Sequence, residues 1–489
     1  MKIKNIFKVS LVTIAFFFVS CEKELDQEPF SQLSDTAFWK TNSDATSAVV
    51  SIYDAMQRHY ASRHFLWGEF RSDAYVAGPL ATTSFLSMVN NALTSDFSGA
   101  VNWSQMYSMI ARANLCIKNI PNIAGYNPEL LAEAHFLRAF AYFDAIRVWG
   151  DVPLFTEPVS SLDQSAFKER ESADKILNEV IIPDMLKANE LMATRTNQFR
   201  VSKSAILNFH GEVYMWLKDW AKAKAAFDQV EAYKAYTLVN TRVAWSDLFF
   251  NDFINGVQVK RMVGSELIFS IRYNQAEDTD RSGVYGLHFA GIPSFFVNPK
   301  LEANWAQRFP IDSVGWAVAF PGIKPLQTTT TGAPFYGDFR YFESREQGRN
   351  PGEARIAKFN KTNINPNFDD TNIHVYRYAT MLYNMAEVEA NLGNNTAAVA
   401  LMNRVRAARL LPTIKQTFSN KDDLIDYILD EKQFESLGEG DRWWDLVRTG
   451  RAIKILGPIN KMTEQTIFWP IFRDHIINNP KLTQNPGYN

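Results

Sequence analysis

The chain has 489 residues, of which 46% are hydrophobic and 21% charged, so it can bury a sizeable core and is not disordered. Lysine and arginine number 51 against 53 acidic residues, a net charge of −2, which excludes a protein that binds nucleic acid through a basic surface. Two cysteines exclude a disulfide framework.

The first residues of the chain predict export and lipid anchoring. Lysines precede an apolar run over Val9–Ser20, and Cys21 follows directly. The run is shorter than the roughly 20 residues that a membrane-spanning helix needs, and it is typical of a signal peptide. A cysteine at this junction favours lipoprotein processing over an ordinary signal peptide with an incidental cysteine. We predict a signal peptide over residues 1–20 and, over residues 21–28, an acylated Cys21 with a tether, which would hold the protein on a membrane.

Helical periodicity dominates the next part of the chain. Apolar residues recur three and four positions apart, and proline and glycine punctuate the ends of the segments. These patterns predict long helices over Ser43–Arg58, Trp103–Ile120 and Pro128–Trp149.

An internal repeat begins shortly after residue 200. Leu207, Gly211, Tyr214, Ala223 and Phe227 have the spacing of a tetratricopeptide helix pair, in which a glycine lets two helices approach and rings fill the seam. Because the pattern is degenerate, chance or generic helix packing is the alternative. Such helix pairs are scaffolds that dock other molecules on their surfaces. Weaker matches begin at Ala139 and at Leu382.

The character of the chain changes between about Tyr236 and Thr371. Proline, glycine, asparagine and aromatic residues become frequent, and the helical stripe disappears. Leu267–Tyr273 predicts a short strand. We therefore expect a mostly α fold, a tetratricopeptide-like helical repeat scaffold with a loop-rich insertion containing short strands. Loops carried by a rigid frame are where binding usually occurs.

Blocks of sequence along the whole chain carry a family likeness. They are Leu25–Pro29, Ala37–Trp39, Ala132–Ala139, Val148–Leu154, Asn403–Ala407, Gly440–Gly450 and Asn478–Tyr488. In this order, the blocks resemble the SusD/RagB family of outer-membrane lipoproteins of Bacteroidetes. The chain departs from the family pattern at Glu431–Glu435, which lacks the usual arginine, and at Leu437–Glu439.

The resemblance implies a surface lipoprotein with about four tetratricopeptide-like helix pairs in a single SusD-like domain over residues 29–489. We divide this domain into an N-terminal helical part (29–235), a ligand-binding insertion (236–371) and a C-terminal helical part (372–489). Family members hold an oligosaccharide, or in some cases a peptide, and pass it to a SusC-like TonB-dependent transporter. The resemblance therefore implies a non-catalytic protein without a cofactor, lipid-anchored to the outer membrane and facing outside.

Motifs of common enzymes are missing from the sequence. It contains no Gly-x-Ser-x-Gly, His-Glu-x-x-His, Gly-x4-Gly-Lys or Cys-x2-Cys. A glycosidase needs only two carboxylates, which 53 acidic residues leave open, but no pair stands out. We expect His59 and His64 to be surface residues rather than metal ligands. The stretch Asn365–Asp370 offers oxygen ligands for a divalent ion, although a solvated turn is the favoured interpretation.

Two adjacent tryptophans, Trp443 and Trp444, resemble a sugar platform at first sight. On a helix, however, neighbouring side chains point about 100° apart, so the two rings rarely face one ligand. We interpret the stretch as structural, because charged residues at helical spacing favour a network that fixes a helix to its neighbours. These residues are Asp441, Arg442, Asp445 and Arg448.

Two segments have the residue types that a sugar requires, namely rings to cover its C–H faces and polar groups to bond its hydroxyls. The first segment follows residue 64 and continues into a stretch rich in glycine, serine and threonine. In the family this connection contributes to the ligand site. The alternative is that its rings only pack the loop down. Its candidates are Trp67 and Tyr75 for stacking, and Arg71, Asp73 and Asn91 for hydrogen bonds.

The second segment is the loop-rich insertion, where aromatic residues alternate with polar ones. For any single ring, packing in the core is the alternative to ligand contact. We expect at least one of Trp67, Trp305 and Trp316 to stack on the ligand. The candidates in the insertion are Tyr285, Phe295, Trp305, Trp316 and Tyr336.

Three functions remain in competition. The leading interpretation is a glycan-capture subunit of a transporter pair. A peptide-capture subunit on the same scaffold would favour open hydrogen-bonding loops over exposed rings. A helical-repeat adaptor without a small ligand would have no pocket with aromatic walls. The sequence identifies neither the glycan nor the surface that faces the transporter.

Overall fold

Paired helices form the frame of the protein in the computed structural model. It describes residues 38–79, 81–159, 166–274, 277, 281–288, 294–309, 337–346, 349–359 and 369–488. The helices of the frame are α3 (Asn42–Tyr60), α7 (Ser104–Asn119), α8 (Pro128–Trp149), α10 (Ile182–Leu191), α11 (Lys203–Trp216), α12 (Trp220–Ala232), α19 (Tyr378–Asn391), α20 (Asn395–Ala408) and α21 (Lys421–Ser436).

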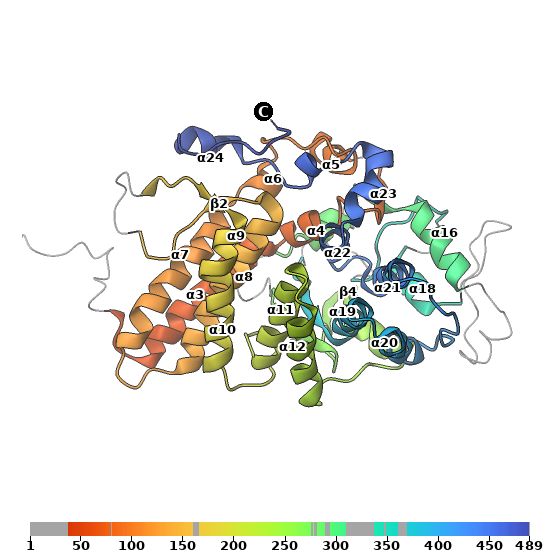
Figure 1. Ribbon diagram of the computed structural model, residues 1–489, viewed down its shortest axis with the longest axis horizontal. Helices are drawn as coiled ribbons and strands as arrows, with labels where there is room; N and C mark the ends of the chain where they lie inside the picture. Colours follow the sequence, from red (N-terminus) through yellow and green to blue (C-terminus); the bar gives the residue numbers. More distant parts are fainter. Residues whose placement is uncertain are drawn as a thin grey trace, which may run out of the picture.

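The helix pairs follow one another in a series, as in a tetratricopeptide scaffold. Helix α3 packs on α7, α8 on α10, α11 on α12 and α19 on α20, while contacts of α7 with α8 and of α12 with α19 join successive pairs. Figure 1 shows the series running from α3 and α7, through α11 and α12, to α19 and α20. The predicted mostly α, tetratricopeptide-like fold is confirmed.

Local sequence explains where the long helices begin and end. Helix α3 begins after Thr41, whose side chain forms a capping box with Asp44. Helix α8 begins with Pro128 after the cap Asn127, and it ends before Gly150, which has a φ of +72°. The three predicted N-terminal helices therefore agree with the structure to within about two residues, as expected of helix ends.

The predicted helix pair around Gly211 is α11 and α12. The side chain of Asp219 caps α12 after a tight turn. A Cβ atom added to Gly211 would lie only 2.2 Å from the ring of Phe227. Glycine is therefore what lets the two helices approach, and Phe227 fills the seam between them.

Short strands form four two-stranded antiparallel sheets among the described residues, of which β1·β7 and β6·β8 connect distant parts of the chain. The strand predicted over Leu267–Tyr273 is β6. It pairs with β8, which directly follows the insertion. The strands are β1 (Tyr75–Ala77), β2 (Val152–Pro153), β3 (Arg170–Glu171), β4 (Asn251–Ile254), β5 (Val257–Lys260), β6 (Leu267–Ile271), β7 (Phe295–Val297) and β8 (Ile373–Arg377).

The remaining helices of the described residues are short. Those in the insertion were not predicted, because its sequence shows no helical periodicity. The short helices are α4 (Arg63–Gly68), α5 (Thr83–Val89), α6 (Ser98–Val101), η2 (Ile120–Asn122), α9 (Ala173–Ile176), the π-helical η4 (Leu177–Ile181), α13 (Arg242–Asp247), α15 (Val284–His288), α16 (Pro299–Arg308), α18 (Phe339–Ser344), α22 (Arg442–Arg448), α23 (Arg451–Asn460), η5 (Glu464–Thr466) and α24 (Arg473–Asn478).

A network of buried charges joins the insertion to the C-terminal helices. Glu435 on α21 accepts hydrogen bonds from Arg340 on α18 at 2.9 Å, from Arg377 on β8 at 2.7 Å and from Arg409 at 2.9 Å. Arg377 and Arg409 also donate to Glu266. All five side chains are buried. Such a network holds only when each charge is paired, so it fixes the relative positions of these elements.

Three of the four charged residues predicted to fix α22, namely Arg442, Asp445 and Arg448, pair with neighbouring elements, whereas the Asp441 side chain makes no such pair among the described residues. Arg442 donates to Asp73 at 2.7 Å, across the whole length of the chain. Asp445 pairs with Lys432 and with Arg448, each at 2.9 Å. Helix α22 is thereby fixed to its neighbours.

Candidate ligand-binding surface

The pairing of β1 with β7 brings the two predicted ligand segments together. Tyr75 lies opposite Val297, and Ala77 lies opposite Phe295. Backbone hydrogen bonds continue the contact on both sides, from Gly78 to Ser294 at 2.7 Å and from Asn298 to Ala74 at 2.8 Å. Two segments more than 200 residues apart in sequence therefore lie side by side, as the pair of Tyr75 and Val297 shows.

A row of contacting aromatic rings extends from the β1·β7 junction towards the surface. Phe70 stacks on Phe295 with ring centroids 3.9 Å apart, and Phe85 on α5 contacts Phe295 at 5.1 Å. Phe97 contacts Phe85 edge-on at 5.9 Å. Phe85 and Phe97 are half-buried, whereas Phe70 and Phe295 are buried, so only the outer end of the row reaches solvent.

Burial corrects the expectation for four of the predicted stacking rings. Trp67, Tyr75, Phe295 and Trp305 are between 1% and 3% exposed, so none of them presents a free ring face. Their sequence context is that of a loop or a short helix, where no periodicity distinguishes the inside from the outside.

Partners within the fold account for the polar atoms of these rings. The indole N–H of Trp67 donates to the carbonyl of Ala100 at 2.9 Å. That of Trp305 donates to Asp338, also at 2.9 Å, and its ring stacks on Phe434 at 4.8 Å. A buried indole with a satisfied N–H is a structural anchor.

The predicted hydrogen-bonding residues of the first segment also bond within the protein. Arg71 donates to the carbonyl of Ile467 at 2.7 Å and to Asn91 at 3.1 Å. Burial lowers the pKa of Arg71 to about 10. Burial would raise the pKa of Asp73, but Arg442 outweighs it and holds the pKa below the ordinary value. Asn91, which is half-buried, also donates to the hydroxyl of Thr466 at 2.9 Å, so all three residues anchor this loop to the C-terminal segment.

The remaining predicted site residues lie elsewhere. Tyr285 on α15 is half-buried, and its backbone N–H donates to Asp369 at 2.9 Å. Trp316, Tyr336 and the predicted lipid-attachment residue Cys21 lie outside the described residues.

A groove of about 270 Å³ runs along α5, next to the β1·β7 junction. Leu86 at its wall is 39% exposed and adds an apolar side chain to a lining that otherwise consists mainly of serine, threonine and asparagine residues. The individual residues were not singled out from the sequence, but the serine- and threonine-rich composition of this stretch was a usable signal. The groove is lined by Thr83, Ser84, Leu86, Ser87, Asn90, Ala92 and Thr94.

Neither a metal centre nor a membrane span emerges from the described ranges. Within them, no group of three or more His, Cys, Asp or Glu side chains is placed to hold a metal ion. No helix in these ranges combines the length and the apolar character needed to cross a bilayer. Asp369 and Asp370 from the predicted oxygen-rich loop are buried, and Asp369 accepts hydrogen bonds from Ser282 and the Tyr285 backbone.

The fold and the joined loops define a tetratricopeptide-like scaffold that carries a loop surface, and comparisons with known proteins agree. A family model described as "SusD family" matches residues 302–462, and one described as "Starch-binding associating with outer membrane" matches residues 24–215. SusD-like protein P38 of Formosa agariphila is 42% identical over the full length of both chains. The chain belongs to the SusD family.

Solved structures share this fold at lower sequence identity. A laminarin-binding SusD-like protein is 21% identical, with a TM-score of 0.69 over 92% of this chain and all of that one. B. fragilis NanU is 22% identical, with a TM-score of 0.69 over 94% of this chain and all of that one.

Proposed function

We propose that the protein captures an oligosaccharide or polysaccharide at the cell surface and passes it, without catalysis, to a SusC-like TonB-dependent transporter. The observation that carries this proposal is the α5 groove beside the β1·β7 junction, where two loop segments meet on a rigid helical frame. Membership of a family with a starch-binding description, and a laminarin-binding protein of the same fold, support a glycan as the ligand.

The chemistry of the groove suits a neutral sugar. The hydroxyls of Thr83, Ser84 and Thr94 and the amide of Asn90 can both donate and accept hydrogen bonds, as sugar hydroxyls do. Leu86 and the neighbouring half-buried Phe85 supply an apolar surface for C–H groups. None of the residues lining the groove is charged, which favours a glycan over the charged ends and side chains of a peptide.

Further contacts extend this site in our proposal. Asn91, which follows the groove residue Asn90 in sequence, and Tyr285 are half-buried and stay candidates for contacts with the ligand, and Trp316 and Tyr336 of the insertion stay candidates for stacking. We also keep the lipoprotein signal over residues 1–20 and acylation of Cys21, which together would place the binding surface on the outer membrane, facing outside.

Affinity electrophoresis tests the proposal. Residues 22–489 would be run through native gels cast with laminarin, starch and a panel of other polysaccharides. We expect one polymer to retard the protein and Asn90→Ala to weaken its binding at least fivefold. Asn178→Ala is the matched control, because this exposed asparagine lies on the distant helix η4.

Two results would contradict the proposal in different ways. Retardation that neither Asn90→Ala nor Trp316→Ala reduces would place the glycan site elsewhere on the molecule. No retardation by any polymer, combined with saturable binding of peptides, would instead assign the protein to peptide capture.

A further inference from the structure

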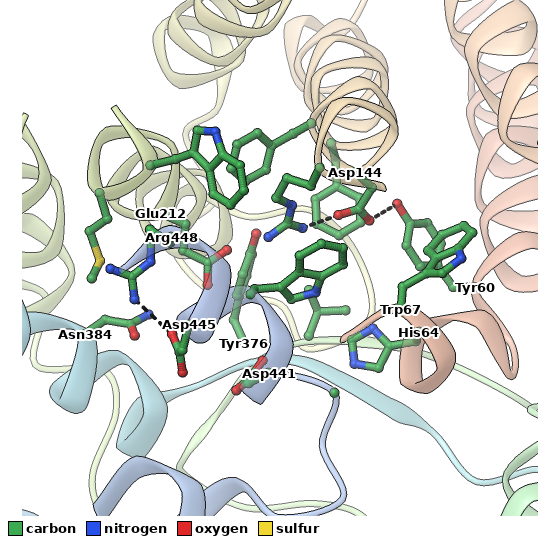
Figure 2. Close-up of a pocket in the computed structure, with 18 of the residues that line it drawn as sticks. Tyr60, His64, Trp67, Asp144, Glu212, Tyr376, Asn384, Asp441, Asp445 and Arg448 are labelled. Atoms are coloured by element: carbon green, nitrogen blue, oxygen red, sulfur yellow. Dashed lines mark hydrogen bonds and ion pairs between the residues drawn. The ribbon is translucent and has the colours of Figure 1, made fainter. Parts of the chain in front are cut away.

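A second cavity, of about 60 Å³, lies where α8, α11 and α22 meet. It shares no lining residue with the α5 groove. Figure 2 shows acidic side chains from three helices around it, with Asp144 from α8, Glu212 from α11 and Asp441 beside α22. Its volume suits a few water-sized groups, not a sugar chain.

The cations around this cavity are already paired with other carboxylates. Arg147 forms an ion pair with Asp144. Lys432 on α21 pairs with Asp445 at 2.9 Å. Arg448 pairs with Asp445 at 2.9 Å and also with Glu387 of α19.

The carboxylates of Glu212 and Asp441 take no part in these ion pairs. Among the described residues, no side-chain hydrogen bond or ion pair is made by Glu212 or Asp441. His64 does not compensate them, because burial lowers its pKa and its Nε2 already contacts the carbonyl of Glu439 at 2.7 Å. Arg147 and Lys432 act on Glu212, and Lys432 on Asp441, only through longer-range attraction, so neither carboxylate has a directly bonded cation.

An independent observation comes from Tyr376 on β8. The side chain is 3% exposed, and its hydroxyl has no hydrogen-bond partner. Figure 2 shows this hydroxyl pointing into the cavity towards Glu212. Because an unpaired buried hydroxyl is costly, a group that hydrogen-bonds to Tyr376 inside the cavity would stabilise this arrangement.

We propose that this cavity binds a small organic ammonium ion. An ammonium group has three donors, which match the carboxylates of Glu212 and Asp441 and the hydroxyl oxygen of Tyr376. The ring of Trp216 forms an apolar wall that can attract a cation and cover its alkyl group, whereas Arg147 already lies over the ring of Trp444 at 4.5 Å. The absence of a three-ligand metal cluster among the described residues favours an ammonium ion over a divalent metal.

Protonation of the two carboxylates competes with this ligand. Burial raises the pKa of Glu212 to about 7 and that of Asp441 to about 6. The ammonium ion therefore binds best above pH 7 and is displaced as the pH falls. The other charged or titratable groups that line the cavity are Tyr60 on α3, His64 on α4, Asp144 and Arg147 on α8, Tyr376 on β8, Lys432 on α21, and Asp445 and Arg448 on α22.

Titration with methylammonium chloride at pH 8 tests the inference, with tryptophan fluorescence and the melting temperature as readouts. We expect saturable binding that is at least tenfold weaker in Glu212→Gln and several-fold weaker in Tyr376→Phe. Methanol and an equal concentration of sodium chloride serve as the neutral and ionic-strength controls. Glu179→Gln, which removes an exposed carboxylate on η4, should bind as the wild type does.

The inference is overturned if methylammonium acts no differently from sodium chloride, or if the cavity variants bind it unchanged. Asp441→Asn replaces Glu212→Gln as the test if the latter does not fold by circular dichroism. Because the ligands and the lining residues differ, loss of methylammonium binding with intact polysaccharide retardation separates this site from the proposed glycan site.

Discussion

Charged side chains at the centre of this protein bond to one another rather than to a ligand. Three guanidinium groups, from Arg340, Arg377 and Arg409, converge on Glu435. Burial would raise the pKa of Glu435, but the three arginines, Arg409 first, outweigh it and hold the pKa well below the ordinary value. Removing any one of these charged groups should therefore destabilise the fold, because an unpaired buried charge costs far more free energy than a paired one.

Glu435→Gln should lower the free energy of unfolding by about 3–5 kcal/mol, because it leaves the arginines without their shared anion. Chemical denaturation at pH 7 measures this loss. The exposed pair of Lys187 and Glu190 provides the control, since Glu190→Gln should change stability by less than about 1 kcal/mol. Equal effects of the two substitutions would contradict a structural role for the network.

Glu212→Gln should raise the free energy of unfolding, and the size of this increase should depend on pH. The folded pKa of Glu212 is about 7, above its ordinary value of 4.5, so the wild type loses stability as the pH rises from about 4.5 through 7. The variant escapes this loss, and its advantage should grow from near zero at pH 4.5 to at most about 3 kcal/mol at pH 8. Melting temperatures of both proteins across this range, without added amines, would show a constant difference if the assignment is wrong.

At the scale of elements, contacts between helices depend on single small residues. Gly211→Ala places a methyl group against the buried ring of Phe227, and we expect a loss of about 1–3 kcal/mol despite alanine's better helix propensity. Thermal unfolding measures it. Gly286→Ala on α15 is the control, because nothing lies within 4 Å of its added Cβ atom, and Phe227→Leu should partly rescue the first variant.

Strand pairs at this scale decide where the candidate site lies. Composition alone pointed to both loop segments, and β1·β7 shows that they adjoin. Composition did not show which rings remain free, since Phe70 is covered by Phe295 from the other segment and Trp305 by Phe434 from α21. Each covering ring comes from a distant part of the chain.

At the scale of the whole molecule, the proposed anchor decides where the protein acts. Cys21→Ser should shift the protein from the membrane fraction to the soluble fraction of cells, because acylation requires the thiol. Membrane fractionation followed by immunoblotting measures the shift. Cys116→Ala, which changes a buried free cysteine, should leave the protein with the membrane. A Cys21→Ser protein that stays in the membrane fraction would contradict lipid anchoring.

The sequence by itself determined the three N-terminal long helices and the α11·α12 seam, because their periodicity and capping depend on residues close together in the chain. It also determined the family, through motifs distributed along the whole chain.

Only the tertiary structure decided which aromatic and charged residues are available to a ligand. Trp67, Tyr75, Phe295 and Trp305 have the residue types of a sugar site, yet the fold buries them. The cavity beside Glu212 is lined by several elements at once, whereas the α5 groove is lined by one stretch whose exposure the rest of the fold decides. In loops, the exposure of side chains follows no periodic pattern along the sequence, because it depends on which distant segment packs against each side chain.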